Sequence, residues 1–593
     1  MKAFFAAVLC AFVPFAALAQ QATDDIAPEA AGAGRIAASS AVVAAQEAKA
    51  AGKPVEARDW MVAVANPLAA EAGARVLRMG GTAADAMVAV QAVLGLVEPQ
   101  SSGLGGGAFL VWRDGGTGKV TTLDGRETAP LAATPQLFQD EQGQPLQFFD
   151  AVVGGRSVGV PGTPALMQAA HDRWGRSEWS GLFTDAISLA DNGFEVSPRL
   201  AKLVAGDALR LDRFGPTRDY FLPDGQPIAQ GERLRNPAYA QVLRRLADDG
   251  AQAFYTGDIA TDITRTVQRA PGNPGRLGML DLAIYGVKER APVCVPYRAY
   301  EVCGMGPPSS GGLTVGQILG LLEPYDLAAM GPDDAQAWRL IGDASRLAFA
   351  DRGRYIADSD FVPVPVKGLV AKEYLNKRAD LLRGDDALPQ VAPGKPEFDH
   401  SLNLADGDAL EFPSTSHISI VDRDGNALSM TTTIENAFGS RLMVRGFLLN
   451  NELTDFSFRS HVDGVPVANR VAPGKRPRSS MAPTIVLKDG QPVLIVGSPG
   501  GSRIIGYVVK AIIAHLDWGL DVQQAIDLPN MVNRFGPYDI EEGRISSRLM
   551  TELASMGYEV AQRPLVSGLH AISIGDVLQG GADPRREGVA LGE

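Results

Sequence analysis

Thr415, in the run Ser-Thr-Ser-His-Ile-Ser-Ile-Val over residues 414–421, is the residue best suited to act as a nucleophile. A threonine hydroxyl is weak alone, but a free α-amine, with an ordinary pKa of about 7.7–8, can serve as its base. If the bond between Ser414 and Thr415 is cut, Thr415 carries both groups. The sequence therefore predicts cleavage after Ser414 and catalysis by the new N-terminal residue.

The residues after Thr415 predict a β-hairpin. Two strand-like runs, 417–421 and 427–434, flank the turn residues Arg423-Asp424-Gly425. A three-residue loop with Gly425 in the left-handed conformation would set Thr433 opposite Thr415. The Thr433 hydroxyl could then orient the Thr415 hydroxyl. Alternatively, Thr433 is only a β-branched strand residue. The segment 384–413, by contrast, is rich in Gly, Pro and Asp and predicts an exposed linker.

Three further clusters carry groups that could bind a substrate. Glu452 and Asp455 are carboxylates three residues apart, which suits an ammonium group but is also common on a solvated surface. Ser479 and Ser480 lie in a proline-bounded loop, which could bind a carboxylate or be an ordinary loop. The segment 497–503, Gly-Ser-Pro-Gly-Gly-Ser-Arg, follows a buried strand. Its backbone N–H groups could form an oxyanion hole, or it is only a tight strand-to-helix turn.

Together with several glycine-rich motifs, these clusters resemble the γ-glutamyltranspeptidase (glutathione hydrolase) family of the N-terminal-nucleophile superfamily. The motifs stand in the family's order from about residue 59 to residue 585, so the resemblance covers nearly the whole mature chain. No single motif is decisive, but the ordered set is highly specific. The motifs are GGTAADA at 80–86, GLGGG at 103–107, DGRETAP at 124–130, GVPG at 159–162, PPSSGG at 307–312 and GADPR at 581–585.

The resemblance implies catalytic roles for four residues. Thr415 would be the nucleophile and the first residue of a small subunit, and Thr433 would support its activation. The backbone N–H groups of Gly500 and Gly501 would stabilise the oxyanion. The mechanism that the family uses needs no metal and no other cofactor.

The resemblance also implies how the substrate is held. Arg126 would pair with its α-carboxylate through a bidentate, charge-assisted contact. Ser479 and Ser480 would donate hydrogen bonds to the same carboxylate. Glu452 and Asp455 would hold the α-ammonium group.

One position departs from the family pattern. Relatives commonly carry Asn two residues after the supporting threonine, but this chain has Glu435. An anion there would oppose the substrate carboxylate and strengthen the ammonium contact. The stretch 456–478, which carries an aromatic lid in some relatives, has no Tyr or Trp, and this indicates a more open donor pocket.

The fold implied by the resemblance is α+β, a four-layer αββα sandwich. Residues 1–19 are expected to be a signal peptide, 20–54 a flexible N-terminus, 55–414 a large subunit and 415–593 a small catalytic subunit. The two subunits would form a heterodimer derived from one precursor and interleave into one αββα unit.

The implied activity is transfer of the γ-glutamyl group of glutathione or other γ-glutamyl amides to water, amino acids or peptides. Two alternatives stay open. One is a cephalosporin or glutaryl acylase of the same fold, although an ammonium binder such as Asp455 would be useless to a glutaryl donor. The other is an uncleaved, non-enzymatic binding protein, which the intact Thr415 hairpin and glycine turn argue against.

The N-terminal residues predict export to the periplasm. Lys2 precedes an apolar stretch and the small-x-small site Ala17-Leu18-Ala19, as in a cleaved secretory signal. The stretch is too short for a membrane anchor. In an oxidising compartment Cys294 and Cys303, set opposite each other by a hairpin turning at 298–299, could form a disulfide, or they are two buried free thiols.

Composition fits a secreted soluble enzyme and excludes some partners. The chain has 593 residues, of which 46% are hydrophobic, enough for a large core. Its net charge of −13 argues against nucleic acid and anionic membranes. His417 lies two residues beyond the nucleophile, but the α-amine of Thr415 makes a histidine base unnecessary.

Overall fold

The computed structural model describes residues 39–593, apart from 408 and 410, and is built on two seven-stranded antiparallel sheets. The predicted signal peptide and residues 20–38 lie outside the described residues. The first sheet has the order β1 (Val55–Ala57), β22 (Leu578–Ala582), β21 (His570–Ile574), β17 (Gln491–Gly497), β16 (Thr484–Lys488), β9 (Tyr300–Gly304), β8 (Val293–Tyr297). The second has the order β23 (Val589–Gly592), β2 (Met61–Val64), β10 (Ser416–Val421), β11 (Ala427–Thr433), β3 (Gly107–Arg113), β4 (Val120–Gly125), β7 (Lys288–Arg290).

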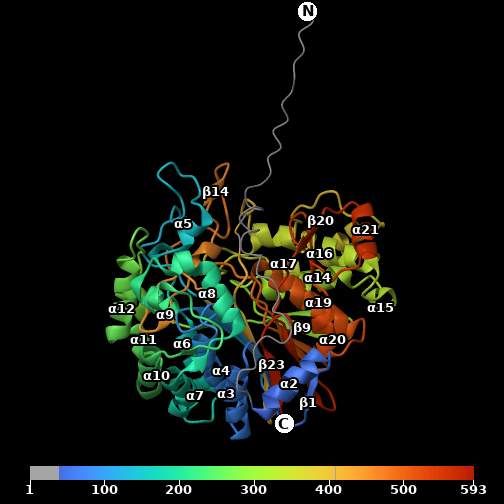
Figure 1. Cartoon of the computed structure of the whole chain (residues 1–593). Coiled ribbons are helices and arrows are strands. Elements are labelled where there is room, and N and C mark those ends of the chain that lie inside the picture. The colour runs from blue at the N-terminus through green and yellow to red at the C-terminus, as the bar shows by residue number, and fades with distance from the viewer. Residues whose placement is uncertain (1–38, 408, 410) are drawn as a thin grey trace, which may run out of the picture.

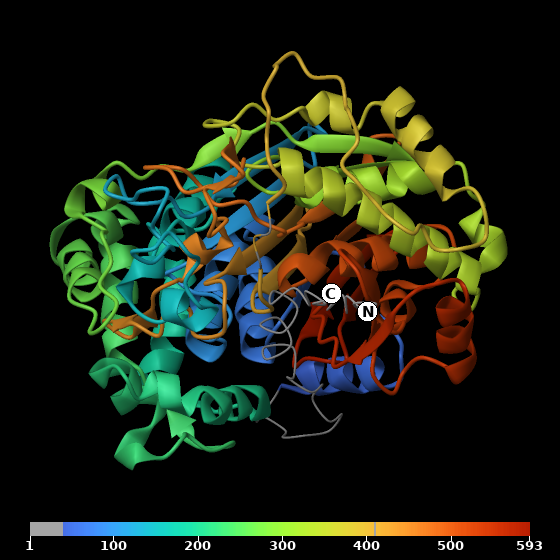
Figure 2. The same cartoon turned by 90° about the horizontal axis from the view of Figure 1, so that it is seen from above.

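Helices cover the outer face of each sheet, as Figures 1 and 2 show, with the blue to green helices on one side and the yellow to red helices on the other. The second sheet is covered by α3 (Pro67–Arg78), α4 (Ala83–Val97), α6 (Thr163–Trp174), α7 (Thr184–Asn192), α8 (Pro198–Leu211), α10 (Pro237–Asp249) and α12 (Gly257–Gln268). The first is covered by α14 (Gly311–Leu322), α16 (Ala335–Tyr355), α18 (Lys372–Ala379), α19 (Ile504–Leu516), α20 (Val522–Asp527) and α21 (Ser547–Ser555).

The alternation of side chains along β10 shows how the layers form. Ile418 and Ile420 point to the helices over the second sheet. Val421 points the other way, into an apolar layer between the two sheets, where it meets residues such as Ile485 and Ile572. Successive strand residues face opposite sides, so each sheet buries both faces. The architecture is the four-layer αββα sandwich that the sequence predicts.

Each sheet contains strands from both sides of the Ser414–Thr415 bond. In the second sheet, β10 pairs with β2 on one side, and β11 pairs with β3 on the other. Two fragments produced by cleavage at this bond would therefore stay joined by backbone hydrogen bonds and by a shared core.

Shorter elements complete the chain. They are the helices α5 (Phe148–Val152), α9 (Gly215–Phe221), α11 (Gln252–Tyr255), α13 (Met279–Ala283), α15 (Leu327–Met330) and α17 (Val366–Leu369), and the strand groups β5 (Phe194–Glu195) with β6 (Arg233–Leu234), β12 (Met443–Val444) with β13 (Phe447–Leu448), β14 (His461–Val462) with β15 (Val465–Pro466), and β18 (Met531–Asn533) with β19 (Tyr538–Glu541) and β20 (Val560–Arg563). Within the described ranges, no helix is both long enough and apolar enough to cross a membrane.

The expectation of a flexible segment over 20–54 is wrong for residues 40–50, which form helix α2 (Ser40–Ala50). Ser39 caps its first turn, and the alanine-rich sequence has high helix propensity. Val42 and Ala45 are buried, and the Lys49 ammonium donates to the carbonyl oxygen of Gly588 at 2.6 Å. Helix α2 thus docks beside the C-terminal strand, as Figure 1 shows.

The exposed linker predicted for 384–413 is also only partly correct. Most of this segment is irregular, but Glu411 and Phe412 are buried, as is Ser414 beyond it. Phe412 packs against Phe148 of α5, with 4.0 Å between ring centroids. Composition could not reveal this burial because it depends on contacts with residues distant in the sequence.

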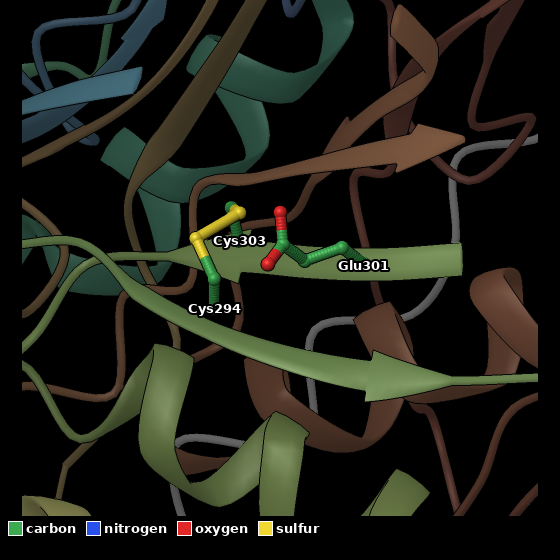
Figure 3. Close-up of side chains that lie close together, drawn as sticks. All are labelled: Cys294, Glu301 and Cys303. Carbon is green, nitrogen blue, oxygen red and sulfur yellow. A yellow bond between two sulfur atoms is a disulfide. The ribbon is translucent and has the colours of Figure 1, made fainter. Parts of the chain in front are cut away.

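The two cysteines of the β8–β9 hairpin form a disulfide, shown in Figure 3. Cys294 pairs directly with Cys303 in the strand register, and the chain turns at 298–299. The carboxylate of Glu301 lies beside the sulfur atoms. Because both sulfurs are used in the disulfide, this group of three is not a metal site.

Candidate active site

The β10–β11 hairpin brings Thr415 and Thr433 together. Ser416 pairs with Thr432, so the register places Thr433 opposite Thr415, as predicted. Their hydroxyl oxygens lie 3.1 Å apart. The Thr433 oxygen also accepts the backbone N–H of Glu435 at 2.8 Å, which fixes the rotamer of Thr433. The Thr433 hydroxyl is therefore placed to orient the Thr415 hydroxyl.

The Ser414–Thr415 peptide is buried and held on both sides. The carbonyl oxygen of Ser414 accepts the N–H of Gly500 at 3.3 Å, and the Ser414 hydroxyl donates to the carbonyl of Gln100 at 2.9 Å. On the other side, the Arg586 guanidinium donates to the carbonyl of Thr415 at 3.1 Å. Thr415 has a φ of 98°, which is rare for a β-branched residue and costs about 1–3 kcal/mol. The peptide at which cleavage is expected is therefore held by hydrogen bonds on both sides, next to a strained backbone at Thr415.

The glycine turn 500–501 joins β17 to α19. Gly500 has a φ of 139°, and a Cβ atom there would lie 2.7 Å from the ring of Tyr507. Gly501 lies against the backbone of residues 411–412, so close that a Cβ would be 2.5 Å from the Glu411 carbonyl oxygen. The N–H of Ser502 donates to that same oxygen at 3.4 Å. The segment before the scissile bond thus runs along this turn.

Arg126, directly after β4, lies at the centre of a buried charge cluster. One of its terminal nitrogens donates to Glu452 and the other to Asp455, both from the 3₁₀ turn 452–455. The same guanidinium also donates to the carbonyl oxygens of Pro477 at 3.2 Å and of Arg478 at 3.0 Å. The structure therefore brings the predicted carboxylate binder and ammonium binders into direct contact.

The acids of this cluster have shifted pKa values. Burial raises the pKa of Glu452 and of Asp455 well above the ordinary range, although Arg126 opposes the shift in both cases. Burial also raises the pKa of the adjacent Glu127 to about 8, against the effect of Arg126. Among the described residues, Glu452 Oε2 and Asp455 Oδ1 find no hydrogen-bond partner. Such buried, unpaired oxygens suit a cationic ligand.

Ser479 and Ser480 lie just before β16 at the edge of this cluster. Ser480 Oγ accepts a hydrogen bond from Arg352 of α16 at 2.7 Å, and Ser479 Oγ accepts the N–H of Met481 at 3.1 Å. Arg352 also forms an ion pair with Glu411. The sequence does not single out Arg352 or Glu411, because no motif at either position distinguishes them from surface charges.

Glu435, two residues after the end of β11, is buried and has a backbone φ of 74°. One carboxylate oxygen accepts the N–H of Phe412 at 3.1 Å, and the other accepts from the side-chain amide of Asn451. Burial, with a contribution from the charge of Glu411, raises its pKa to about 7. This side chain lies between the segment before the scissile bond and the acids that follow Asn451.

His417 and His570 are not part of this cluster. His417 is fully buried between the sheets, where its ring nitrogens contact the hydroxyls of Thr431 at 2.9 Å and Ser419 at 3.0 Å. Burial lowers the pKa of His417 well below its ordinary value, and the nearby His570 lowers it further. His417 is a neutral core residue of the hairpin.

These elements together have the architecture of an N-terminal-nucleophile hydrolase. A threonine directly precedes an inner strand, β10, of an αββα sandwich, a second hydroxyl contacts it, and an N–H donor meets the carbonyl of the preceding peptide. The chain belongs to the gamma-glutamyltranspeptidase family, whose sequence model matches residues 69–593.

Comparisons with individual proteins agree with this family assignment. The chain is 37% identical over 549 residues to the glutathione hydrolase proenzyme of Bacillus subtilis, covering 90% of this chain and 92% of that one. It is 33% identical over 549 residues to the acylase ACY 1 proenzyme of a Pseudomonas species (strain SE83), covering 91% and 94%. Its structure resembles the crystal structure of a cephalosporin acylase from Bacillus halodurans, with a TM-score of 0.80, 26% identity and coverage of 91% and 97%.

Proposed function

We propose that this protein is a γ-glutamyl hydrolase and transferase that acts on glutathione and related γ-glutamyl amides, with amino acids or short peptides as acceptors. The observation that carries this substrate class is the buried cluster in which Arg126 meets Glu452 and Asp455. Arg126 can contact an α-carboxylate, while the unpaired oxygens of Glu452 and Asp455 can accept from an α-ammonium group. A γ-glutamyl group carries both charges on one carbon atom.

Self-cleavage comes first. The Thr415 hydroxyl oxygen attacks the carbonyl carbon of Ser414, its proton passes to the departing nitrogen of Thr415, and the peptide becomes an ester. The N–H of Gly500, already on the carbonyl oxygen, stabilises the oxyanion. Water then hydrolyses the ester, which releases a carboxylate at Ser414 and leaves a free α-amine on Thr415. Relief of the strained φ at Thr415 favours the reaction.

Turnover uses the same hydroxyl. The α-amine of Thr415 accepts the hydroxyl proton as the oxygen attacks the γ-carbonyl carbon of the donor, and the proton is passed to the amine that leaves. Thr433 orients the hydroxyl, and the N–H groups of Gly500 and Gly501 hold the oxyanion. Water, or the amino group of an acceptor, then attacks the γ-glutamyl ester and regenerates Thr415.

A glutaryl or cephalosporin acylase is the second candidate, since the chain is similar to an acylase proenzyme in sequence and to a cephalosporin acylase in structure. A glutaryl donor has a carboxylate but no ammonium group. The buried oxygens of Glu452 and Asp455 would then have no cation to pair with, at a cost of about 1–3 kcal/mol for each unpaired group. This observation favours the γ-glutamyl donor.

We also propose that the enzyme works in the periplasm. The pattern of residues 1–19 supports export through a cleaved signal peptide. The Cys294–Cys303 disulfide is consistent with an oxidising compartment. Fractionation of cells, with activity found in the cytoplasm rather than the periplasm, would contradict this assignment.

One experiment tests the function as a whole. A denaturing gel of the purified protein should show two fragments, and N-terminal sequencing should find Thr-Ser-His at the start of the smaller one. The cleaved protein should hydrolyse a γ-glutamyl anilide faster than a glutaryl anilide. A single uncleaved chain without activity would indicate a binding protein, and preference for the glutaryl donor would indicate an acylase.

A further inference from the structure

The turn 586–588, which directly precedes β23, contacts the backbone of the nucleophile. The Arg586 guanidinium donates to the carbonyl oxygen of Thr415 at 3.1 Å, and Arg586 is only 3% exposed. Its aliphatic stem passes over Gly568, where an added Cβ would lie 2.8 Å from Arg586 Cδ. The surrounding protein therefore leaves Arg586 little freedom to move away from Thr415.

Glu98, which ends α4, lies beside Arg586 and holds the next residue of β10. Its Oε2 atom accepts the hydroxyl of Ser416 at 2.8 Å. Burial raises the pKa of Glu98, while the positive charges of Arg199 and Arg586 oppose this shift. The carboxyl group of Glu98 and the guanidinium of Arg586 thus hold two consecutive residues, Ser416 and Thr415.

Helix α2 holds the backbone of the same turn. The Lys49 ammonium donates to the carbonyl oxygen of Arg586 at 3.0 Å and to that of Gly588 at 2.6 Å. Gly588 also lies against β21, so close that an added Cβ would be 2.1 Å from His570 Nε2. The turn is fixed between α2 and the first sheet. Lys49 therefore reaches Thr415 through one intermediate residue, Arg586.

Cleavage after Ser414 would change what restrains Thr415. In the uncleaved chain, Gly500 holds the peptide before Thr415 through the Ser414 carbonyl, and Arg586 holds the peptide after it. Breaking the bond removes the first restraint and frees the α-amine that serves as the base. The hydrogen bond from Arg586 then fixes the Thr415 backbone, and with it the directions of the amine and the hydroxyl. Misplacing a reacting group by about 1 Å can cost about 10²-fold in rate.

We propose that Arg586 is a positioning residue for Thr415 in the cleaved enzyme, and that Lys49 of α2 acts through Arg586 by fixing the turn 586–588. The proposal rests on Thr415 as the nucleophile of the proposed function, and it adds the N-terminal helix to the parts that support turnover. The charges of the donor bind at the Arg126 cluster, so loss of either side chain should lower kcat and change KM little.

Arg586→Gln should lower kcat for a γ-glutamyl anilide roughly 10- to 150-fold, the range for a lost hydrogen bond from a charged group. Arg586→Lys should restore part of the loss, because an ammonium can also donate to the Thr415 carbonyl. Self-cleavage should slow less than turnover, since Gly500 still holds the Ser414 carbonyl. Arg548→Gln, at a surface pair with Glu552, is the matched control and should leave kcat unchanged.

The role of Lys49 is tested by a double-mutant cycle. Lys49→Met should lower kcat about 2- to 12-fold, the range for an ordinary hydrogen bond. The double variant Lys49→Met, Arg586→Gln should be no slower than Arg586→Gln alone, because Lys49 acts through Arg586. Lys53→Met, at an exposed position just beyond α2, is the control and should match wild type. Losses that add in the double variant would show that Lys49 acts by another route.

A wild-type kcat in Arg586→Gln would overturn the proposal, as would a loss that lies in KM and leaves kcat unchanged. Circular dichroism reports whether each variant folds. If Arg586→Gln does not fold, Arg586→Lys and Lys49→Met decide, and unchanged kcat in both overturns the proposal. Donor choice is read from wild type alone. If wild type prefers a glutaryl anilide, the γ-glutamyl function fails, and the same variants, assayed on that donor, still test the positioning of Thr415.

Discussion

The backbone N–H of Gly500 donates a hydrogen bond of 3.3 Å to the carbonyl oxygen of Ser414, the carbonyl group of the bond predicted to break. The donor thus already touches the oxygen on which negative charge would develop during self-cleavage. The same N–H faces the space where the donor's γ-carbonyl would be attacked later. We therefore propose that one turn serves both reactions.

Gly500→Ala should slow self-cleavage and, in any cleaved protein, lower kcat. An added Cβ would lie 2.7 Å from the Tyr507 ring, and the φ of 139° disfavours any side chain, so the N–H must move. Losing one oxyanion donor typically costs about 10²–10³ in rate. The rate of fragment appearance on gels measures this. Gly490→Ala is the matched control, since Gly490 also has a positive φ but open space around it. Equal rates in both variants would exclude the donor role.

Thr433→Val should lower the rates of both self-cleavage and turnover, because it removes the hydroxyl 3.1 Å from that of Thr415 while keeping the side-chain shape. Thr432→Val provides the control one residue away. The Thr432 hydroxyl is buried without a partner among the described residues, so its loss should leave activity and stability unchanged or improve stability. Similar rates for Thr433→Val and wild type would show that this hydroxyl only fills space.

Much of this site could be predicted from the sequence because its parts are local. The hairpin register follows from the positions of Gly425 and of the two strand-like runs, and it correctly sets Thr433 opposite Thr415. The cysteine hairpin is local in the same way, with Cys294 opposite Cys303. Each of these relationships depends on a short turn, where chain geometry alone fixes the partner.

The remaining parts depend on contacts between distant segments. Arg352 meets Glu411 and Ser480 only after α16 has packed against the first sheet. The mutual pairing of Arg126 with Glu452 and Asp455 has no periodicity from which to infer it. Such partners are set by the tertiary fold, and a single sequence gives only their residue types.

Asp455→Asn should weaken γ-glutamyl donors more than glutaryl donors. The substitution removes one charge that faces the α-ammonium, and hydrogen bonds to charged groups are worth about 1.5–3 kcal/mol. The ratio of kcat/KM for γ-glutamyl over glutaryl anilide should therefore fall roughly 10- to 150-fold. Measuring the ratio cancels general damage to the site. An unchanged ratio would make Asp455 a structural partner of Arg126 and remove it from donor recognition.

Glu435→Asn should change donor KM while leaving self-cleavage at Thr415 intact. The carboxylate lies beside Asn451 and the acids that follow it, close to where the ammonium group would bind. Replacing it removes an attraction for the ammonium and a repulsion of the α-carboxylate, so KM should also become less sensitive to salt. Steady-state kinetics at two ionic strengths test this. Unchanged KM in the Asn variant would place Glu435 outside the donor site.

The uncleaved chain should lose stability as pH rises toward 7 because of Glu435. Burial, with help from the charge of Glu411, raises its pKa to about 7 in the folded chain. In the unfolded chain the carboxyl releases its proton near its ordinary pKa of about 4.3. Between these values the folded state binds more protons, so each rise in pH favours unfolding; the stabilisation is complete below the unfolded pKa and is lost through the folded pKa.

The measurement is the free energy of unfolding of the Thr415→Ala chain, which keeps Glu411 in place, between pH 5 and pH 8. The double variant Thr415→Ala, Glu435→Gln cannot ionise at this position, so its stability should fall less over the same range. Glu542→Gln in the same background, at an exposed site, should leave the slope as it was. If the Glu435→Gln curve runs parallel to that of its parent, the carboxyl of Glu435 does not titrate in this range. The ammonium contact proposed for Glu435 would then involve a carboxyl group that is ionised over the whole range from pH 5 to pH 8.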